Sequence, residues 1–400
     1  MRVLIINKFL YPKGGSETYI FSLAETLRAH GHQVQFFGLR NAKNIVGNRI
    51  DALVSDMEFA DGVKKNLTAP LRIIYNRQAR REIRRVLDDF QPDALHVNNI
   101  EFHLTPSILL EIDQWRRQSG KSCRVVYTAH DYQLVCPSHG MFTPDRRPCE
   151  KCLDGRYGHC IRAKCIKGST LKSMLGAADA YYWRRRNVYK AVDAFICCSR
   201  FLKDKLDTQP QYSGKTVALH NFVHVPACPD VQKKDYVLYF GRMSPEKGAD
   251  ALLKAAERMP GQAFVFAGSG PSEAKARGIP NVRCVGFQSG AALYRLIAEA
   301  RLSVCPSECY ENCPFSIIES ISLGTPVVGA RIGGIPELIR PGQTGELFPA
   351  GDVDALVRAI QQVGAAEAAS GAYSRNCSAA DFETAQSYYD RLMTLYRAAE

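Results

Sequence analysis

The stretch Glu311-Asn-Cys-Pro-Phe-Ser-Ile-Ile-Glu319 joins a predicted strand to a predicted helix. Before it runs Leu302-Ser-Val-Cys-Pro-Ser307, which is typical of a strand, and after it comes a small-residue turn, Gly324-Thr-Pro-Val-Val-Gly329. Proline is tolerated in the first turn of a helix, so a helix is predicted to begin near Pro314. The stretch therefore indicates one strand–helix unit of a parallel α/β protein.

Two glutamates eight residues apart give this stretch its chemistry. The backbone around Asn312, Cys313 and Phe315, where the helix opens, is predicted to form an anion site. Glu319 is expected to accept hydrogen bonds from ribose hydroxyls, and Glu311 to meet a second group of hydroxyls. Phosphates with hydroxyls on both sides describe a nucleotide sugar. Taken alone, two glutamates at this spacing are more often solvated helix residues, and the neighbouring motifs decide against that interpretation.

Two cations follow a predicted strand in Tyr239-Phe-Gly-Arg-Met-Ser-Pro-Glu-Lys-Gly248. Arg242 and Lys247 are expected at the carboxyl edge of a sheet, where α/β proteins bind ligands. There they would stabilise the charge that develops on a departing nucleoside diphosphate, so no catalytic metal is expected. The alternative for this segment is a solvated turn.

The first half supplies further candidates. Gly14 and Gly15 lie between the first predicted strand and helix, where bare backbone can approach a phosphate or a sugar. The dinucleotide fingerprint Gly-x-Gly-x-x-Gly is absent, and an ordinary turn is the alternative. His130 ends the predicted strand Arg124–Ala129, and Asp131 is expected to orient its imidazole toward a sugar. A buried, satisfied histidine is the alternative.

Five of the fourteen cysteines fall within thirty residues. The spacing Cys149-x2-Cys152 is typical of a zinc site, and Cys160 and Cys165 follow it closely. In a reducing compartment this pattern favours thiolate ligands to zinc over disulfides. A structural zinc is therefore predicted on these four residues, with Cys136 as a further candidate ligand. Scattered cysteines without a ligand are the alternative.

Length and composition bound the protein class. At 400 residues two domains are expected, and 46% hydrophobic with 23% charged residues is typical of a globular protein. No stretch approaches 18 apolar residues, and the first residues form a strand pattern rather than a signal peptide, so a cytoplasmic protein is expected. β-branched runs alternate with helical stretches throughout. The predicted strands are Val3–Asn7, Gln33–Gly38, Ala94–Asn98, Arg124–Ala129, Ala194–Cys198, Val217–His220, Tyr236–Phe240, Ala263–Ala267, Val282–Gly286, Leu302–Cys305 and Pro326–Gly329.

Charge is unevenly distributed along the chain. Residues 1–200 hold 32 Lys and Arg against 19 Asp and Glu, while residues 201–400 hold 20 against 21. Six arginines lie between Arg72 and Arg85, and Trp183 is followed by three more. These segments are expected to face an anionic membrane surface, on its inner side, or to be solvated helix faces. Nucleic acid is the other anionic partner considered, and it is not expected because it leaves the residues around Glu311 unexplained.

The motifs together resemble the retaining glycosyltransferases of family 4, also called group 1. The resemblance rests on the block Pro306–Ala330, its continuation Ile332-Gly-Gly-Ile-Pro-Glu337, the segment ending in Lys247-Gly248, and Pro12-Lys-Gly-Gly-Ser-Glu17. It spans about residues 1 to 395. One departure is Pro314, which replaces a usual glycine and removes one backbone N–H from the expected phosphate site.

The resemblance implies a GT-B fold, with two Rossmann-like domains facing across a cleft. Residues 1–222 would bind the acceptor. They would include a Cys-rich insert, residues 136–168, of the kind found in members of this family that assemble polysaccharides. Residues 235–380 would bind the nucleotide sugar, and residues 381–400 would form a helix that crosses back to the first domain. The proline-containing segment 223–235 is the predicted linker.

The same resemblance assigns the reaction. It implies transfer of a sugar from a UDP- or GDP-sugar to a saccharide or polyprenyl-linked acceptor during assembly of a cell-surface polysaccharide. Arg242 and Lys247 would bind the diphosphate, and His130 would line the reacting face. A nucleotide-sugar epimerase of the same fold is one alternative, and a zinc-containing nucleic-acid-binding protein is the less favoured one.

Overall fold

The structure is a computed structural model that describes residues 1–55, 69–225 and 231–397. Contacts group the chain into two compact units, each built on one six-stranded sheet. The first unit comprises Met1–Pro144, Cys149–Leu219 and Ala385–Glu400. The second comprises Asp145–Pro148 and His220–Thr384.

The first sheet is parallel throughout and has the strand order β2-β1-β5-β6-β7-β8. A separate pair of two-residue strands, β3 and β4, is also parallel. The strands of this unit are β1 (Arg2–Ile6), β2 (Gln33–Phe37), β3 (Leu39–Arg40), β4 (Val54–Ser55), β5 (Ala94–Val97), β6 (Arg124–Ala129), β7 (Ala194–Cys197) and β8 (Thr216–Ala218).

Helices lie between successive strands of the six-stranded sheet, as parallel pairing requires. Among them α3 packs on α4, α5 on α6, and α1 on α13, which comes from the C-terminal end of the chain. The helices of this unit are α1 (Gly15–Ala29), α2 (Ala69–Ile74), α3 (Arg77–Phe90), α4 (Ser107–Ser119), α5 (Gly158–Arg162), α6 (Thr170–Arg186), α7 (Arg200–Asp207) and α13 (Ala385–Tyr396).

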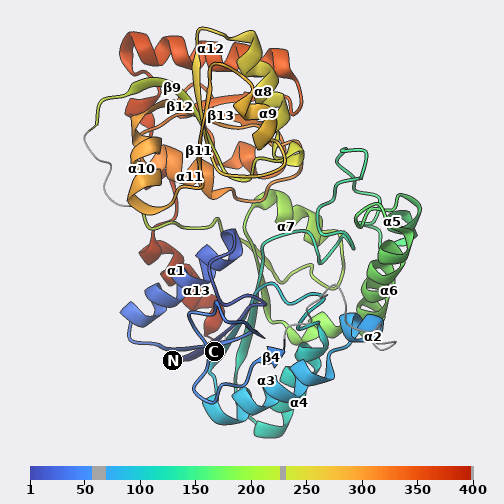
Figure 1. Cartoon of the computed structure of the whole chain (residues 1–400). Helices are drawn as coiled ribbons and strands as arrows, with labels where there is room; N and C mark the ends of the chain where they lie inside the picture. The colour runs from blue at the N-terminus through green and yellow to red at the C-terminus, as the bar shows by residue number, and fades with distance from the viewer. Residues whose placement is uncertain (56–68, 226–230, 398–400) are drawn as a thin grey trace. The chain divides into compact units, whose positions relative to one another are not determined.

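The second sheet is parallel as well, with the order β11-β10-β9-β12-β13-β14. Two helix pairs, α8 with α12 and α10 with α11, pack beside it (Figure 1). Its strands are β9 (Lys234–Phe240), β10 (Ala263–Ala267), β11 (Val282–Gly286), β12 (Ala300–Cys305), β13 (Val327–Ala330) and β14 (Gly345–Phe348). Its helices are α8 (Ala249–Arg258), α9 (Glu273–Arg277), α10 (Gly290–Glu299), α11 (Phe315–Ser322) and α12 (Val353–Ser370).

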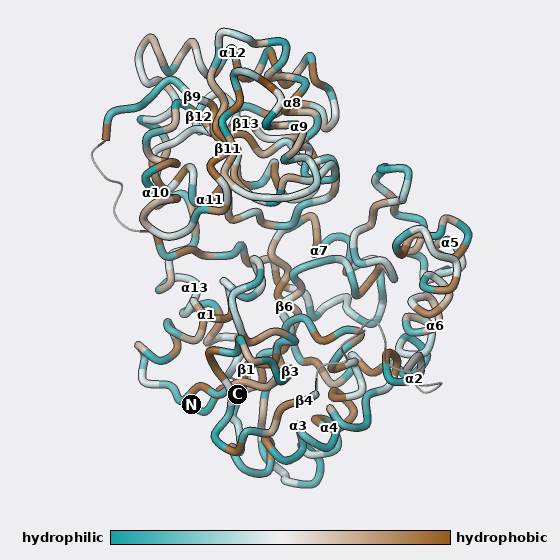
Figure 2. The backbone as a smooth tube through the Cα atoms, viewed as in Figure 1, coloured by the Kyte–Doolittle hydropathy of each residue, from teal (hydrophilic) through white to brown (hydrophobic). Residues whose placement is uncertain are grey.

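The strands supply the core of each unit. In β1, Val3, Leu4, Ile5 and Ile6 are fully buried, and hydrophobic residues mark the strands of both sheets (Figure 2). Continuous apolar runs of this kind are expected where a parallel sheet is covered on both faces. The predicted parallel α/β architecture is confirmed.

Helix α13 belongs to the first unit because its tyrosines enter a buried polar network there. Tyr388 Oη lies 2.7 Å from Tyr19 Oη, and Tyr396 Oη lies 2.6 Å from His96 Nδ1. Burial lowers the pKa of His96 to about 3, so this imidazole is neutral at ordinary pH. Neutral, mutually bonded groups can be buried at low cost, which lets a polar network hold the helix.

One strand of the second sheet was not expected from the sequence. β14 (Gly345–Phe348) follows the last predicted strand, Pro326–Gly329, and begins at Gly345. A Cβ at Gly345 would lie 1.8 Å from the carbonyl oxygen of Val327, so only glycine permits this pairing of β14 with β13. Of the predicted linker 223–235, residues 226–230 lie outside the described residues, and β9 begins at Lys234.

Candidate functional site

The second sheet reverses its winding between β9 and β12. From β9 the chain moves outward to β10 and β11, and it then returns to place β12 on the other side of β9. Open α/β sheets bind ligands at the carboxyl ends of the strands at such a switch point. The loops after β9 and β12 meet here, and they carry Arg242, Lys247 and Glu311.

Close backbone contacts hold these loops together. Gly248 has φ +72°, and a Cβ there would lie 1.8 Å from the carbonyl oxygen of Pro306. Gly333, which follows β13, has φ +58°, and a Cβ there would lie only 2.3 Å from the carbonyl oxygen of Glu311. Only glycine combines this conformation with this approach. The loops after three neighbouring strands therefore pack backbone to backbone.

The approach of the loops brings Lys247 to Glu311. Lys247 Nζ donates a hydrogen bond of 2.6 Å to Glu311 Oε1, and Ser307 Oγ donates to the same oxygen at 2.6 Å. Burial alone would lower the pKa of Lys247, but the carboxylate of Glu311 raises it above its ordinary value. The ammonium therefore stays charged in a partly buried place, where charge acts more strongly than in water.

Arg242 adds a second cation at the same edge. Its side chain is 70% exposed, and its guanidinium lies 3.8 Å from Glu246 Oε1. Tyr239 Oη donates a 2.6 Å hydrogen bond to the Arg242 carbonyl, which fixes the backbone of the loop. An exposed guanidinium on a fixed loop can bind an incoming phosphate through two oxygens.

Helix α11 starts at Phe315, where the sequence predicts a helix. Pro314 is the N-cap residue, and no side chain caps this end, so the first N–H groups of the helix point outward. Asn312 is buried, and the thiol of Cys313 accepts a 3.3 Å hydrogen bond from the backbone N–H of Asn221. The side chain of Cys313 is thus used for packing, and the anion site expected on the backbone of this segment stays a prediction.

Glu319 lies one turn further along α11 and is half-buried. Burial raises the pKa of its carboxyl group to about 7. A carboxyl group that titrates near neutral pH at the edge of a ligand site is typical of functional residues.

The first sheet has its own switch point, between β1 and β5. Gly14 is the N-cap residue of α1 and Gly15 is its first residue; both are exposed, and no side chain caps the helix. Gly14 has extended backbone, and a Cβ there would meet its nearest atom only at 3.6 Å. Packing within the unit therefore does not require glycine at this position.

His130 follows β6 at the same edge. Its Nε2 lies 2.9 Å from Asn98 Oδ1, and its ring contacts Tyr19 with 4.9 Å between ring centroids. Burial lowers the pKa of His130 to about 3, so the imidazole is neutral. Asp131, expected to orient this ring, instead accepts a hydrogen bond from the backbone N–H of Gln133, and its carboxylate lies 3.9 Å from His139.

Sequence reasoning missed the polar residues that follow β5. Asn98 holds the imidazole of His130, and Glu101, which is buried, accepts a 2.8 Å hydrogen bond from Tyr127 Oη. Burial raises the pKa of Glu101 to about 8, and the nearby carboxylate of Asp131 adds to this shift. The pair Asn98-Asn99, directly after a buried strand, could have pointed to these residues. Residues at the carboxyl end of a strand lie at the edge of the sheet where α/β proteins bind ligands.

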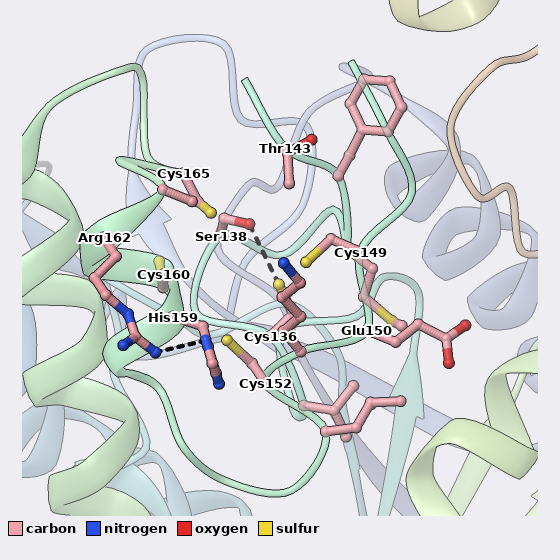
Figure 3. A pocket seen from close by; sticks show the side chains of 16 residues that line it. Cys136, Ser138, Thr143, Cys149, Glu150, Cys152, His159, Cys160, Arg162 and Cys165 are labelled. Atoms are coloured by element: carbon pink, nitrogen blue, oxygen red, sulfur yellow. Dashed lines mark hydrogen bonds between the residues drawn. The ribbon is translucent and has the colours of Figure 1, made fainter. Parts of the chain in front are cut away.

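The structure brings the predicted zinc ligands to one place. Five cysteines line a cavity of about 360 Å3 in the first unit, where Figure 3 shows their sulfur atoms around a common space. They are Cys136, Cys149, Cys152, Cys160 and Cys165. All thirteen described cysteines are free thiols. Among the described residues, no three or more His, Cys, Asp or Glu side chains are grouped so that they could hold a metal ion.

The arginine-rich helix α3 differs from the expected basic face. Each of its four central arginines forms an ion pair with a carboxylate, so little unpaired positive charge remains on it. The pairs are Arg80–Glu111, Arg81–Glu82, Arg84–Asp88 and Arg85–Glu82.

Trp183 was also expected on the basic surface, and this expectation is wrong. Its side chain is buried and stacks near Tyr75, while its Nε1 donates a 2.9 Å hydrogen bond to Asp179. Within the described ranges, no helix is both long enough and apolar enough to cross a bilayer.

Comparisons with known proteins agree with this geometry. The model of a family described as Glycosyltransferase Family 4 matches residues 13–225, and one described as Glycosyl transferases group 1 matches residues 234–365. A 42.6 kDa protein in the cps region of Klebsiella pneumoniae is 23% identical over 85% of this chain and 88% of its own length. The D-inositol 3-phosphate glycosyltransferase of Mycolicibacterium paratuberculosis is 33% identical, over 42% of this chain and 41% of its own.

Solved structures show the same fold at low identity. The lipopolysaccharide outer core galactosyltransferase WaaB is 18% identical, with a TM-score of 0.61 over 99% of both chains. HepE from Anabaena in complex with UDP is 15% identical, with a TM-score of 0.68 over 98% of this chain and 99% of that one.

The contact of Gly248 with Pro306 predicts a specific loss of stability. Gly248→Ala should destabilise the second unit by about 1–3 kcal/mol more than Gly351→Ala does. Gly351 also has a positive φ, of +80°, but no atom lies within 4 Å of its Cβ position, so it isolates the cost of the backbone conformation. Urea unfolding followed by far-ultraviolet circular dichroism measures both, and equal losses would contradict the close approach.

Proposed function

Because the chain belongs to glycosyltransferase family 4, we propose that it transfers a sugar from a nucleoside diphosphate to a saccharide or lipid-linked acceptor, with retention of configuration. The enzyme is a glycosyltransferase with the GT-B fold. The donor, the acceptor and the stereochemical course are the proposed part.

One observation carries the proposal: the ion pair of Lys247 with Glu311 at the switch point of the second sheet. A departing nucleoside diphosphate gains negative charge in the transition state. Lys247 and Arg242 would bind its oxygens, and the open N-terminus of α11 would add backbone N–H groups. Cations and N–H groups fixed before the reaction need no reorganisation when the charge appears.

The two carboxylates would hold the hydroxyl groups of the donor. Lys247 and Ser307 fix the carboxylate of Glu311, so it would be held in place to accept hydrogen bonds from the sugar. Glu319, further along α11, would accept them from the ribose. We propose UDP as the nucleotide, because the similar HepE structures hold UDP and UDP-glucose. A GDP-sugar is the alternative that the experiment below distinguishes.

The bond changes of a retaining transfer balance without a metal. The bond between the anomeric carbon and the diphosphate oxygen breaks, and a bond to the acceptor oxygen forms on the same face. The acceptor proton passes to the leaving phosphate. His130 is neutral, so in this scheme it hydrogen-bonds the sugar rather than supplying a charge.

The first unit would bind the acceptor at its own switch point. Gly14 and Gly15 leave the start of α1 open, and Asn98 and Glu101 add polar side chains beside His130. The relative in a cps region and the fold shared with WaaB favour assembly of a cell-surface polysaccharide or lipopolysaccharide. For such an acceptor we propose that the enzyme acts in the cytoplasm, at the inner face of the membrane.

Helix α6 offers the surface that would meet this membrane. Leu171, Met174 and Tyr181 are 68%, 50% and 39% exposed, and they follow one face of the helix. Arg185 continues the same face and Arg186 lies beside it, both exposed. Apolar side chains beside arginines suit the interface of an anionic bilayer. We place the membrane contact here rather than on α3, whose arginines are paired.

The donor site predicts which nucleotide stabilises the protein. In a thermal-shift panel of UDP, GDP and their sugars, UDP compounds should raise the melting temperature. At a ligand concentration of 100 times Kd, binding should add about 2.7 kcal/mol to the free energy of unfolding. Lys247→Ala should abolish this shift and lower kcat/KM about 100-fold or more. Lys254→Ala, which removes an exposed lysine of α8, is the matched control. An unchanged nucleotide shift in Lys247→Ala would remove that residue from the site.

The raised pKa of Glu319 predicts a pH dependence of nucleotide binding. Ribose hydroxyls donate to the ionised carboxylate, which forms only as the pH rises through about 7. UDP affinity should therefore increase up to about tenfold between about pH 6 and about pH 8. The phosphates of UDP titrate in the same range, so Glu319→Gln serves as the reference. Isothermal titration showing the same slope in both proteins would contradict the assignment.

The α6 surface predicts binding to anionic lipid. The protein should pellet with anionic vesicles at low salt and be released as salt rises, because salt screens the arginines. Leu171→Ser with Tyr181→Ser should weaken binding by at least about tenfold, since two apolar side chains lose their burial. Phe287→Ser, which removes another side chain that is 78% exposed, is the control. Equal pelleting of wild type and double variant would show that α6 is only a solvated face.

A further inference from the structure

The cysteine-lined cavity is a site that the proposed transfer reaction does not use. Its thiols come from three places: the turn after β6, the segment before α5, and α5 with the residues that follow it. They are also near one another, since the thiols of Cys160 and Cys165 share a hydrogen bond. Cys152 lies close enough to Cys136, Cys149 and Cys165 for electrostatic interaction with each.

The segment around the cavity has little else to hold it. Residues 136–168 contain one regular element, α5, of five residues. The buried members of its apolar cluster are Cys152, Tyr157, Cys160 and Ala177, so half of them are cysteines. Peptide segments shorter than about 40 residues rarely bury enough apolar surface to be stable without a disulfide or a metal. No disulfide joins the described cysteines.

The backbone of the same segment is unusual. Half of the ten non-glycine residues with positive φ in the described ranges lie between positions 139 and 167. Each such conformation costs roughly 1–3 kcal/mol and persists only when the surroundings fix it. These residues are His139, Met141, Arg146, Lys164 and Lys167.

The residues that line the cavity favour a metal ion over a sugar or a nucleotide as its ligand. Besides the five thiols, Met141, Phe142 and Leu153 contribute apolar surface, which offers few hydrogen bonds to a sugar or a nucleotide. Clustered thiolates are the preferred ligands of soft or borderline metal ions, and zinc takes four of them in a tetrahedron. His159 also lines the cavity, but its Nδ1 already accepts a 2.8 Å hydrogen bond from Arg162.

We propose that this cavity binds one zinc ion through four of its five cysteines, always including Cys152 and Cys160, and that the ion fixes residues 136–168. The ligands must close in from their described positions, since no three of them are grouped there so that they could hold a metal ion. Each coordinating thiol loses its proton to solvent on binding, so affinity rises with pH. The role is structural because four thiolates fill the coordination sphere and leave no open position for substrate.

The zinc content of the purified protein tests the proposal. Purified under reducing conditions from zinc-containing medium, the full chain should carry about one zinc per chain by elemental analysis. Cys152→Ser with Cys160→Ser should lose the metal. Cys284→Ser with Cys377→Ser, which removes two half-buried thiols of the second unit, should retain it. Equal zinc in both double variants, or iron in place of zinc, would overturn the assignment.

A second measurement applies if the first double variant does not fold. Wild-type protein treated with a strong chelator should expose the five thiols to a thiol reagent and speed hydrogen exchange in 136–168 but not in β9–β14. Adding Co2+ should then produce thiolate-to-cobalt absorption. Zinc-free protein with slow exchange in 136–168, or Co2+ without that absorption, would refute the proposal independently of any glycosyl transfer.

Discussion

The close approach of Gly248 to the carbonyl oxygen of Pro306 is the constraint on which the second unit's site depends. It leaves no room for a side chain at Gly248, and it brings the loops after β9 and β12 into backbone contact. Lys247 is the residue before that contact, so its ammonium reaches Glu311 at 2.6 Å. The chemistry of the site follows from a packing requirement: a charged pair can be held at a sheet edge only when both loops are fixed.

The two units treat charge in opposite ways. In the second unit, Lys247 and Arg242 remain charged at the ligand edge, which suits a site for an anionic leaving group. In the first unit, burial lowers the pKa values of His96 and His130 to about 3, so these two imidazoles are neutral. A neutral, hydrogen-bonding surface suits sugar hydroxyls, which carry no charge. This division supports donor binding by one unit and acceptor binding by the other.

Sequence patterns predicted the features that depend on local chemistry. The alternation of strands and helices, the helix start at Phe315 and the clustering of the cysteines all follow from composition and spacing over a few residues. Other features depend on partners far away in the chain. β14 requires a glycine against Val327 of β13, and the buried ring of Trp183 stacks on Tyr75, which lies far away in the chain.

Charge was the least predictable property for the same reason. The number of arginines in α3 predicted a basic helix face. However, Arg80 and Arg84 form ion pairs with Glu111 on α4, and the sequence around α3 does not predict that contact. Asp131, the neighbour of His130 in the sequence, was predicted to orient its imidazole. Instead the imidazole is hydrogen-bonded to the side chain of Asn98, at the end of the adjacent strand. Ion pairs and hydrogen bonds across the fold decide which polar groups remain available to a ligand.

A crystal structure of the protein with a bound UDP-sugar tests the central claim most directly. We expect the diphosphate on Lys247 and Arg242 at the start of α11, the ribose on Glu319 and the sugar hydroxyls on Glu311. A nucleotide bound elsewhere in the second unit, with no phosphate near Lys247, would show that these residues do not form the donor site.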